Sequence, residues 1–206
     1  YPDHFLGNNA FGNVDIYASE YTANYIKKYG EDYIQNMASI ILDWSKDTYL
    51  KAPNKIIKSN TLTLSNHKFK VLHLKGHTTS DIALYDTNTK VLFASDLVFY
   101  DRAAALPHAT ISNWIKSINV LEKIPYKVIV PGHGAVSESK KPLKQMKNYL
   151  TFVDKALKDG AKKGLDYFEI INAKKPNKFK SIEVLDEEFE RSIINQYPSY
   201  EESHYH

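Results

Sequence analysis

Residues of the types that bind metals occur at four points along the chain. Asp3 and His4 open it, His77 and His133 each lie beside glycine, and Asp96 follows an apolar run. Imidazole nitrogens and carboxylate oxygens are the donors that zinc accepts where thiolates are absent, and the chain has no cysteine. A single histidine of this kind is usually a hydrogen-bonded structural residue, and a single aspartate is usually a turn former. Their recurrence at the ends of successive elements predicts a metal site.

Short strands must position these side chains. His77 lies between two strand-like runs and follows Gly76, which lets the backbone turn so that the loop can aim the imidazole. Asp96 ends an apolar strand-like run, where a carboxylate is costly unless a cation or a hydrogen bond compensates it. His133 ends the buried strand predicted over 128–130.

The wider pattern alternates helices and strands. We predict a short helix over 5–12, a strand over 14–18, and a mostly helical stretch from an N-cap at Ser19 to about residue 49, interrupted at Gly30. Further strands are predicted over 61–64, 69–74, 81–85, 90–94 and 128–130. Further helices are predicted over 111–123, 139–158, 164–172 and 186–196. This order predicts a layered α/β domain.

The composition excludes several classes of partner. With 206 residues, 43% of them hydrophobic, the chain can form one core of ordinary size. The net charge of +3, from 27 basic and 24 acidic residues, predicts no nucleic-acid partner. Lysines cluster at 140–147, 162–163 and 174–180, which we interpret as solvated helix faces and loops. No apolar run approaches the ~20 residues of a membrane span, so no membrane partner is expected.

The motifs together resemble those of the metallo-β-lactamase superfamily. The resemblance rests on Asp3-His4 with Gly7, Gly76-His77-Thr78, Ser95-Asp96 and Pro131-Gly132-His133-Gly134. It covers residues 1–136, followed by a helical C-terminal extension of the same domain over 137–206. Three further segments, Asp3–Asn8, Leu97–Phe99 and Tyr197–Glu202, resemble a bacterial subgroup of zinc metallohydrolases associated with quinoproteins and sulfur oxidation. The resemblance implies an αββα sandwich.

The same resemblance implies roles for the five residues. One metal would be held by two histidines of a His-x-His-x-Asp-His motif together with His77. The other would be held by Asp3, His4 and His133, and Asp96 would bridge the two. The catalytic role falls to Asp3, which would orient the nucleophile and accept its proton.

The activity implied by the resemblance is metal-dependent hydrolysis. A metal-bound hydroxide would attack an ester, thioester, amide or lactam-type carbonyl of a small-molecule substrate. The loop after the bridging aspartate borders the active site in the family. Tyr100, Arg102 and His108 are therefore candidate substrate-binding residues, with simple loop residues as the alternative.

The chain departs from the family pattern near its start. Counting back from Asp3 places one motif histidine on Tyr1 and the other before the chain, so one zinc ion is expected here instead of the two of an intact member. The first strands of the sandwich are not found either, which predicts an N-terminally incomplete domain. Ser95 replaces the glycine that usually precedes the bridging aspartate, and we expect a mild effect.

Alternatives to the hydrolase remain open at this point. One is a non-catalytic or partially metallated fragment that acts as a metal-binding or partner-binding domain. Another is half of a two-chain enzyme, completed in a homodimer or by a complementing chain. The bridging carboxylate resembles glyoxalase-II-like members, which argues against antibiotic hydrolysis. The subgroup favours the periplasm over the cytoplasm.

Overall fold

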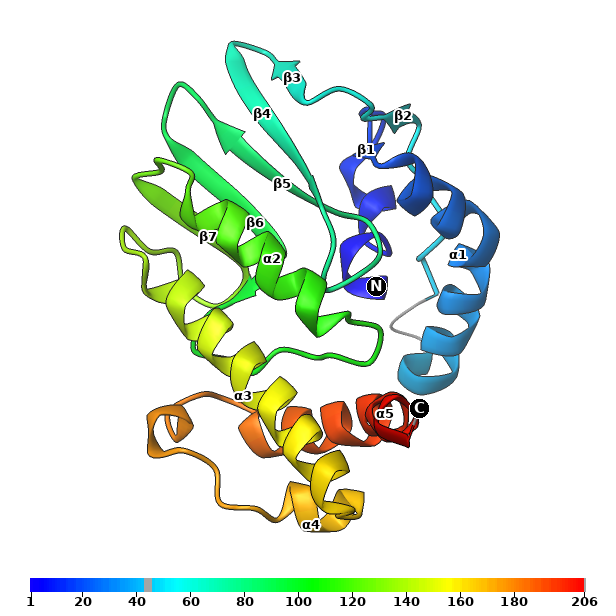
Figure 1. The fold of residues 1–206 in the computed structure, drawn as a ribbon. Coiled ribbons are helices and arrows are strands. Elements are labelled where there is room, and N and C mark those ends of the chain that lie inside the picture. The colour runs from blue at the N-terminus through cyan, green and yellow to red at the C-terminus, as the bar shows by residue number, and fades with distance from the viewer. Residues whose placement is uncertain (43–45, 206) are drawn as a thin grey trace. The chain divides into compact units, whose positions relative to one another are not determined.

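The chain forms two compact units. A computed structural model describes residues 1–42 and 46–205, and the units are Tyr1–Ser59 and Asn60–His206 (Figure 1). The predicted division at residue 136, between the domain and its helical extension, stays a prediction. In the structure, helices α3 (Lys141–Lys163) and α5 (Leu185–Tyr205) belong to the same unit as the larger sheet.

The first unit is built around helix α1 (Glu20–Ile41). The Ser19 hydroxyl accepts a hydrogen bond from the Thr22 N–H at 3.1 Å, which confirms the predicted N-cap. The helix continues through Gly30, so the predicted interruption there is wrong. A Cβ at Gly30 would lie 2.5 Å from Cδ1 of Leu50, so the glycine serves close packing and does not end the helix. Tyrosines at four-residue spacing line this helix, at positions 21, 25, 29 and 33.

Short elements complete the first unit. Two 3-10 segments, η1 (Pro2–His4) and η2 (Asn8–Phe11), replace the single helix predicted over 5–12. Strand β1 (Tyr17–Ala18) pairs in parallel with β2 (Lys55–Ile56). The strand predicted over 14–18 is shortened because the preceding backbone bonds to a side chain, as the N–H of Ile16 donates to Oδ1 of Asn54 at 2.8 Å.

The second unit is built on a five-stranded sheet with the order β3-β4-β5-β6-β7. The strands are β3 (Thr61–Leu64), β4 (His67–Leu74), β5 (Asp81–Asp86), β6 (Val91–Phe99) and β7 (Val128–His133). Neighbouring strands are antiparallel except β6 and β7, which are parallel. A parallel pair needs a crossover connection, and helix α2 (Ile111–Glu122) lies in that connection. The predicted strands are confirmed, but β6 runs five residues past the predicted end at 94.

Helices α2 and α3 cover one face of this sheet (Figure 1). The strand residues on that face, including Ala83, Leu92 and Ile129, are fully buried. On the opposite face, Leu84 and Val130 flank Phe93, whose exposed fraction is 41%. The alternation follows from the two-residue period of a strand, which sends successive side chains to opposite faces.

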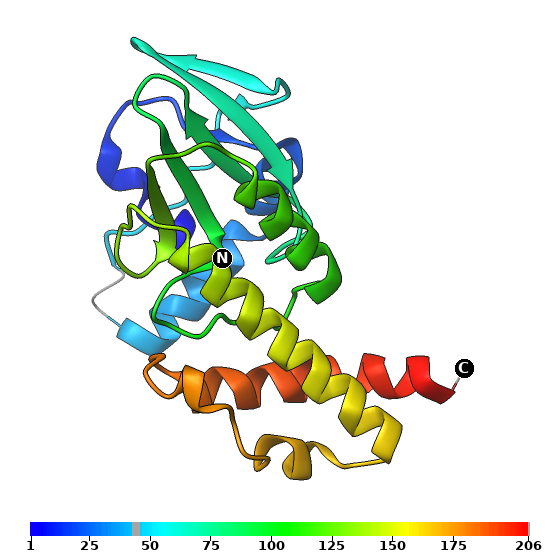
Figure 2. The same cartoon turned by 60° about the vertical axis from the view of Figure 1, so that its left-hand side comes forward.

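The C-terminal helices pack on α3. Helix α4 (Tyr167–Ile171) begins with a capping box between Asp166 and Glu169, and the 3-10 segment η4 (Asn177–Phe179) precedes α5. Figure 2 shows α5 crossing α3. The buried Phe189 of α5 stacks on Phe152 of α3. The predicted last helix is confirmed but extends through Pro198 to Tyr205. Within the described residues, no helix is both long and apolar enough to cross a membrane.

Candidate metal centre

Three of the five predicted ligands converge in the second unit. Nε2 of His77 lies 3.3 Å from Oδ2 of Asp96, and Nε2 of His133 lies 3.6 Å from Oδ1 of the same carboxylate. Asp96 is 5% exposed and His77 is 3% exposed, whereas His133 is half-buried. One buried carboxylate therefore lies between two imidazoles, with a different oxygen toward each.

A β-bulge in β6 sets the direction of the Asp96 carboxylate. Asp96 lies within the strand, which continues to Phe99, so the prediction that it ends a strand is wrong. The pairing of β6 with β7 shifts register on both sides of Ser95, and Ser95 has a φ of +50°. Such a bulge bends a strand and redirects the next side chain. The left-handed conformation favours glycine, so serine adds local strain at this position.

The loop between β4 and β5 carries His77. The N–H of Thr110 donates to the carbonyl of Gly76 at 3.0 Å, which ties this loop to the start of α2. A Cβ at Gly76 would lie 2.5 Å from the Cα of Trp114, so only glycine permits this close approach. The Trp114 ring lies 5.0 Å from the His77 ring, and its Nε1 donates to the Leu97 carbonyl at 2.9 Å. The imidazole thus packs against the Trp114 ring, which is itself hydrogen-bonded to strand β6.

His133 ends strand β7, as predicted. Its ring stacks on Phe99 at 4.5 Å, and its carbonyl accepts a hydrogen bond from the Tyr100 N–H at 2.9 Å. The flanking glycines are required by packing. A Cβ at Gly132 would collide with Oδ1 of Asp96, and a Cβ at Gly134, where φ is +98°, would collide with the Tyr100 carbonyl.

The donor set fits a zinc ion. Two donors about 2.0–2.1 Å from a tetrahedral zinc lie about 3.3 Å apart, which is close to the measured separations of 3.3 and 3.6 Å between Nε2 of His77 or His133 and the Asp96 oxygens. Nitrogen and carboxylate oxygen are both ordinary zinc ligands. A cation also offsets the cost of burying the Asp96 carboxylate. Each imidazole and the Asp96 oxygen that faces it can therefore supply two ligands of a metal ion.

Asp3 and His4 lie in the first unit, on segment η1. Both side chains are exposed, and Nε2 of His4 lies 3.7 Å from Oδ2 of Asp3. The two residues thus form a second nitrogen–oxygen donor pair on a single turn. Their predicted role as ligands stays a prediction.

The predicted substrate-binding residues lie on the segment after β6. Tyr100 is half-buried, and His108 is exposed. Arg102 forms an isolated bridge with Glu183, so its backbone is tied to the segment before α5. Their contact with substrate stays a prediction.

Two residues beside the site were not assigned to it from the sequence. Asp81 accepts hydrogen bonds from the N–H of Thr78 at 3.1 Å and from its hydroxyl at 2.6 Å, which closes the loop that carries His77. Burial raises the pKa of the Asp81 carboxyl, although these hydrogen bonds oppose the rise. The Thr-x-x-Asp spacing of Thr78 and Asp81 is the sequence pattern that could have indicated these hydrogen bonds. Trp114 lies in the helix predicted over 111–123, and nothing in its spacing indicated the contact with His77.

Curated relatives match about half of the chain. Acyl-coenzyme A thioesterase MBLAC2 of Gallus gallus is 24% identical over 106 residues, which are 48% of this chain and 38% of that protein. Acyl-coenzyme A thioesterase MBLAC2 of Homo sapiens is 26% identical over 98 residues, which are 45% of this chain and 35% of that protein. The chain thus aligns with little more than a third of the length of these relatives.

Solved structures share the fold. A metallo-beta-lactamase from Pontibacter korlensis matches with a TM-score of 0.57 and 22% identity, covering 73% of this chain and 65% of that one. Metallo-beta-lactamase IND-7 matches with a TM-score of 0.56 and 21% identity, covering 73% of this chain and 64% of that one. The family model described as the metallo-beta-lactamase superfamily matches residues 2–133, which is more than half of the chain. The chain therefore belongs to the metallo-beta-lactamase superfamily.

Proposed function

We propose that this chain carries the site of a zinc-dependent hydrolase whose substrate is a thioester. The observation that supports it is the buried Asp96 carboxylate with Nε2 of His77 and of His133 on its two oxygens. A carboxylate and two imidazoles at this spacing are suited to holding a metal, and membership of a family of metallohydrolases supports that assignment.

Asp96 and His133 would provide two of the ligands of one zinc ion. Asp96 supplies the negative charge and His133 a neutral nitrogen donor, while His77 faces the other oxygen of the Asp96 carboxylate. A bound zinc ion would polarise the carbonyl oxygen of the substrate and lower the pKa of a water molecule. Trp114 and Phe99 exclude water from one side of His77, because their rings lie 5.0 and 5.7 Å from the imidazole. A drier surrounding strengthens the electrostatic interactions of the site.

Asp3 and His4 would complete the set of zinc ligands. The support is the Asp-His motif, together with the Asp3 and His4 donor atoms that lie 3.7 Å apart on one turn. In this proposal His4 adds a nitrogen ligand, and Asp3 orients the attacking water and accepts its proton. With Tyr1 in place of a motif histidine, we propose that a single ion is bound.

The thioester is chosen from the relatives and from its chemistry. Two curated relatives are named acyl-coenzyme A thioesterases, whereas the lactamase structures, below 25% identity, support the fold alone. A thiolate with a pKa near ~8.5 leaves without prior protonation. Hydrolysis of a thioester therefore needs an activated water and a polarised carbonyl but no general acid for the leaving group.

Release of thiol provides a direct assay. The chain has no cysteine, so Ellman's reagent detects only the thiol that is released from an acyl-coenzyme A substrate. We expect turnover that depends on zinc, and elemental analysis should give one zinc ion per chain. Replacing a ligand, in His133→Gln or Asp96→Asn, should reduce both zinc affinity and turnover by more than about 100-fold, since losing an outer hydrogen-bond partner of a ligand alone costs about 10- to 100-fold.

Matched controls separate this result from general damage. His73→Gln changes an exposed histidine on β4, and Asp159→Asn changes a partly exposed aspartate on α3 paired with Lys155. Both should keep zinc binding and turnover. Zinc binding at the predicted residues without turnover would instead support the alternative of a metal-binding domain. Thiol release that persists in Asp96→Asn would overturn the proposed site.

A further inference from the structure

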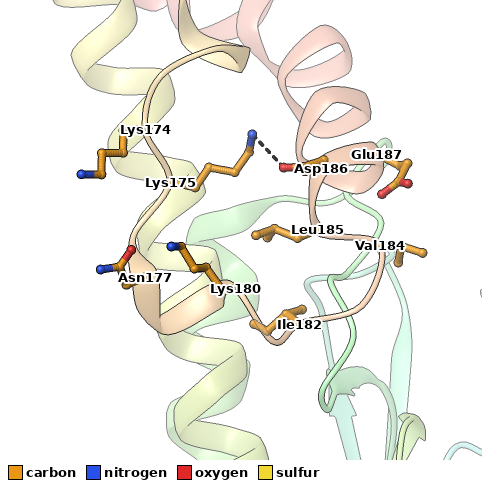
Figure 3. A pocket seen from close by; sticks show the side chains of 9 residues that line it. All are labelled: Lys174, Lys175, Asn177, Lys180, Ile182, Val184, Leu185, Asp186 and Glu187. Atoms are coloured by element: carbon orange, nitrogen blue, oxygen red, sulfur yellow. Dashed lines mark ion pairs between the residues drawn. The ribbon is translucent and has the colours of Figure 1, made fainter.

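A pocket in the second unit lies apart from the predicted ligands in the sequence. It has a volume of about 520 Å³ and lies between the loop before η4 and the segment that leads into α5 (Figure 3). Its lining is Lys174, Lys175, Asn177, Lys180, Ile182, Val184, Leu185, Asp186 and Glu187. Volumes of about 300–1,000 Å³ are usual for small-molecule sites.

The lining of the pocket contains more lysines than carboxylates. Lys175 forms an ion pair with Asp186 at 3.0 Å and donates to the Ile171 carbonyl at 3.3 Å, so these two opposite charges offset one another. The other charged residues of the lining are Lys174, Lys180 and Glu187, so the lining as a whole carries a net charge of +1. Figure 3 shows Lys180 extending into the space between the two segments. Lys174, Lys178 and Lys180 are exposed, in agreement with the interpretation of 174–180 as a solvated loop.

An apolar surface lies beside these charges. Ile182 is 6% exposed, and Leu185 and Val184 are half-buried. Figure 3 shows the Leu185 side chain directed toward the loop that carries the lysines. A ligand that satisfies both parts of the lining has a compact anionic group next to an apolar one.

The backbone of the apolar wall is held in an unusual conformation. Val184 has a φ of +49°, which is a rare state for a β-branched residue. The residue before it is fixed by two hydrogen bonds, in which Ala103 N–H donates to the Glu183 carbonyl at 3.0 Å and Glu183 N–H donates to the Asp101 carbonyl at 2.9 Å. Strained positions that the surrounding structure maintains cluster at ligand-binding sites.

From these observations we propose that this pocket binds a small organic anion, with the ammonium group of Lys180 on its anionic group, Lys174 adding positive charge at the edge, and Ile182 and Leu185 on its apolar part. Lysine suits this role because its ammonium is a point charge that can donate hydrogen bonds to a phosphate or carboxylate in several directions. The proposal does not depend on zinc or on hydrolysis.

The test uses phenyl phosphate, which combines an anionic and an apolar group. It is titrated into the ¹⁵N-labelled full chain at constant ionic strength, and backbone amide shifts are recorded. We expect saturable shifts confined to residues 174–187. The double variant Lys174→Gln/Lys180→Gln should bind about tenfold more weakly, as expected for the loss of two exposed charge interactions.

Two controls make the result decisive. Lys162→Gln/Lys163→Gln removes the same charge from exposed positions at the end of α3 and should change the affinity less than about twofold. Phenol, which lacks the phosphate, should not bind. The proposal is overturned by equal weakening in both double variants, by equal binding of phenol, or by shifts centred on His77, Asp96 and His133. Far-UV circular dichroism verifies that the lysine variants fold.

Discussion

Gly132→Ala tests whether β6 and β7 pack at the metal centre as closely as the structure indicates. An added Cβ would lie 2.7 Å from the carbonyl carbon of Ser95 and 2.8 Å from the backbone N of Asp96, and it would collide with the Asp96 carboxylate. Two of these contacts involve backbone, which cannot rotate away as a side chain can. The two strands must therefore separate.

The size of the effect follows from these distances. Ordinary contact begins at 3.4 Å, so the backbone contacts fall short by about 0.6–0.7 Å (3.4 minus 2.8 and 3.4 minus 2.7). Overpacking of this kind typically lowers the free energy of unfolding by about 1–3 kcal/mol. Metal–ligand distances are defined to within about 0.2 Å, so a shift of this size in Asp96 should weaken zinc binding by at least about tenfold.

Urea denaturation of the metal-free protein and isothermal titration with zinc measure the two effects separately. Gly160→Ala is the matched control, because its added Cβ would collide with the Ile170 side chain, among residues outside the predicted ligand set. It should lower stability and leave zinc affinity unchanged. If Gly132→Ala bound zinc as tightly as the unaltered chain and unfolded at the same urea concentration, the argument that this glycine positions Asp96 would be wrong.

Three further predictions concern stability. Ser95→Gly should raise the free energy of unfolding by about 0.5–1 kcal/mol in urea denaturation, because serine is held at a φ of +50° where glycine is unstrained; an unchanged or lower value would contradict the strain. Burial alone would raise the pKa of Asp86, but hydrogen bonds from Thr89, Asn88 and His67 outweigh it and lower that pKa to about 2. The folded-state pKa lies below the unfolded one, so this stabilisation is present above about pH 4 and is lost as pH falls toward 2. The stability difference between the unaltered chain and Asp86→Asn should therefore shrink between about pH 5 and pH 2 in urea denaturation, and a difference independent of pH would contradict the assignment. Zinc at 100 times its dissociation constant should stabilise the chain by about 2.7 kcal/mol in thermal unfolding, reversibly on adding chelator, and Asp96→Asn should lose this increment; equal stabilisation of both proteins would place the ion elsewhere.

Local sequence patterns predicted most of the second unit. Strand β3 and helix α2 were located to within a residue, since alternation and helical spacing are properties of short segments. The end of β6 was not predicted, because Asp96 suggested a turn. Pairing with β7 extends that strand to Phe99, and such pairing depends on residues far along the chain. Gly30 was misjudged for a similar reason, because its neighbour Leu50 is 20 positions away.

The sequence by itself determined the metal-binding residue types and their order, because ligand chemistry depends on side-chain identity. Its motifs also resembled those of the metallo-beta-lactamase superfamily, and the match of the family model to residues 2–133 confirms that resemblance. Only the tertiary structure decided that His77 and His133 lie on different oxygens of one buried carboxylate, that Ser95 redirects that carboxylate, and that Trp114 supports His77. It likewise decided that Lys174, Lys175 and Lys180 line a pocket. These features depend on how separate elements pack, and packing brings together groups that no local pattern relates.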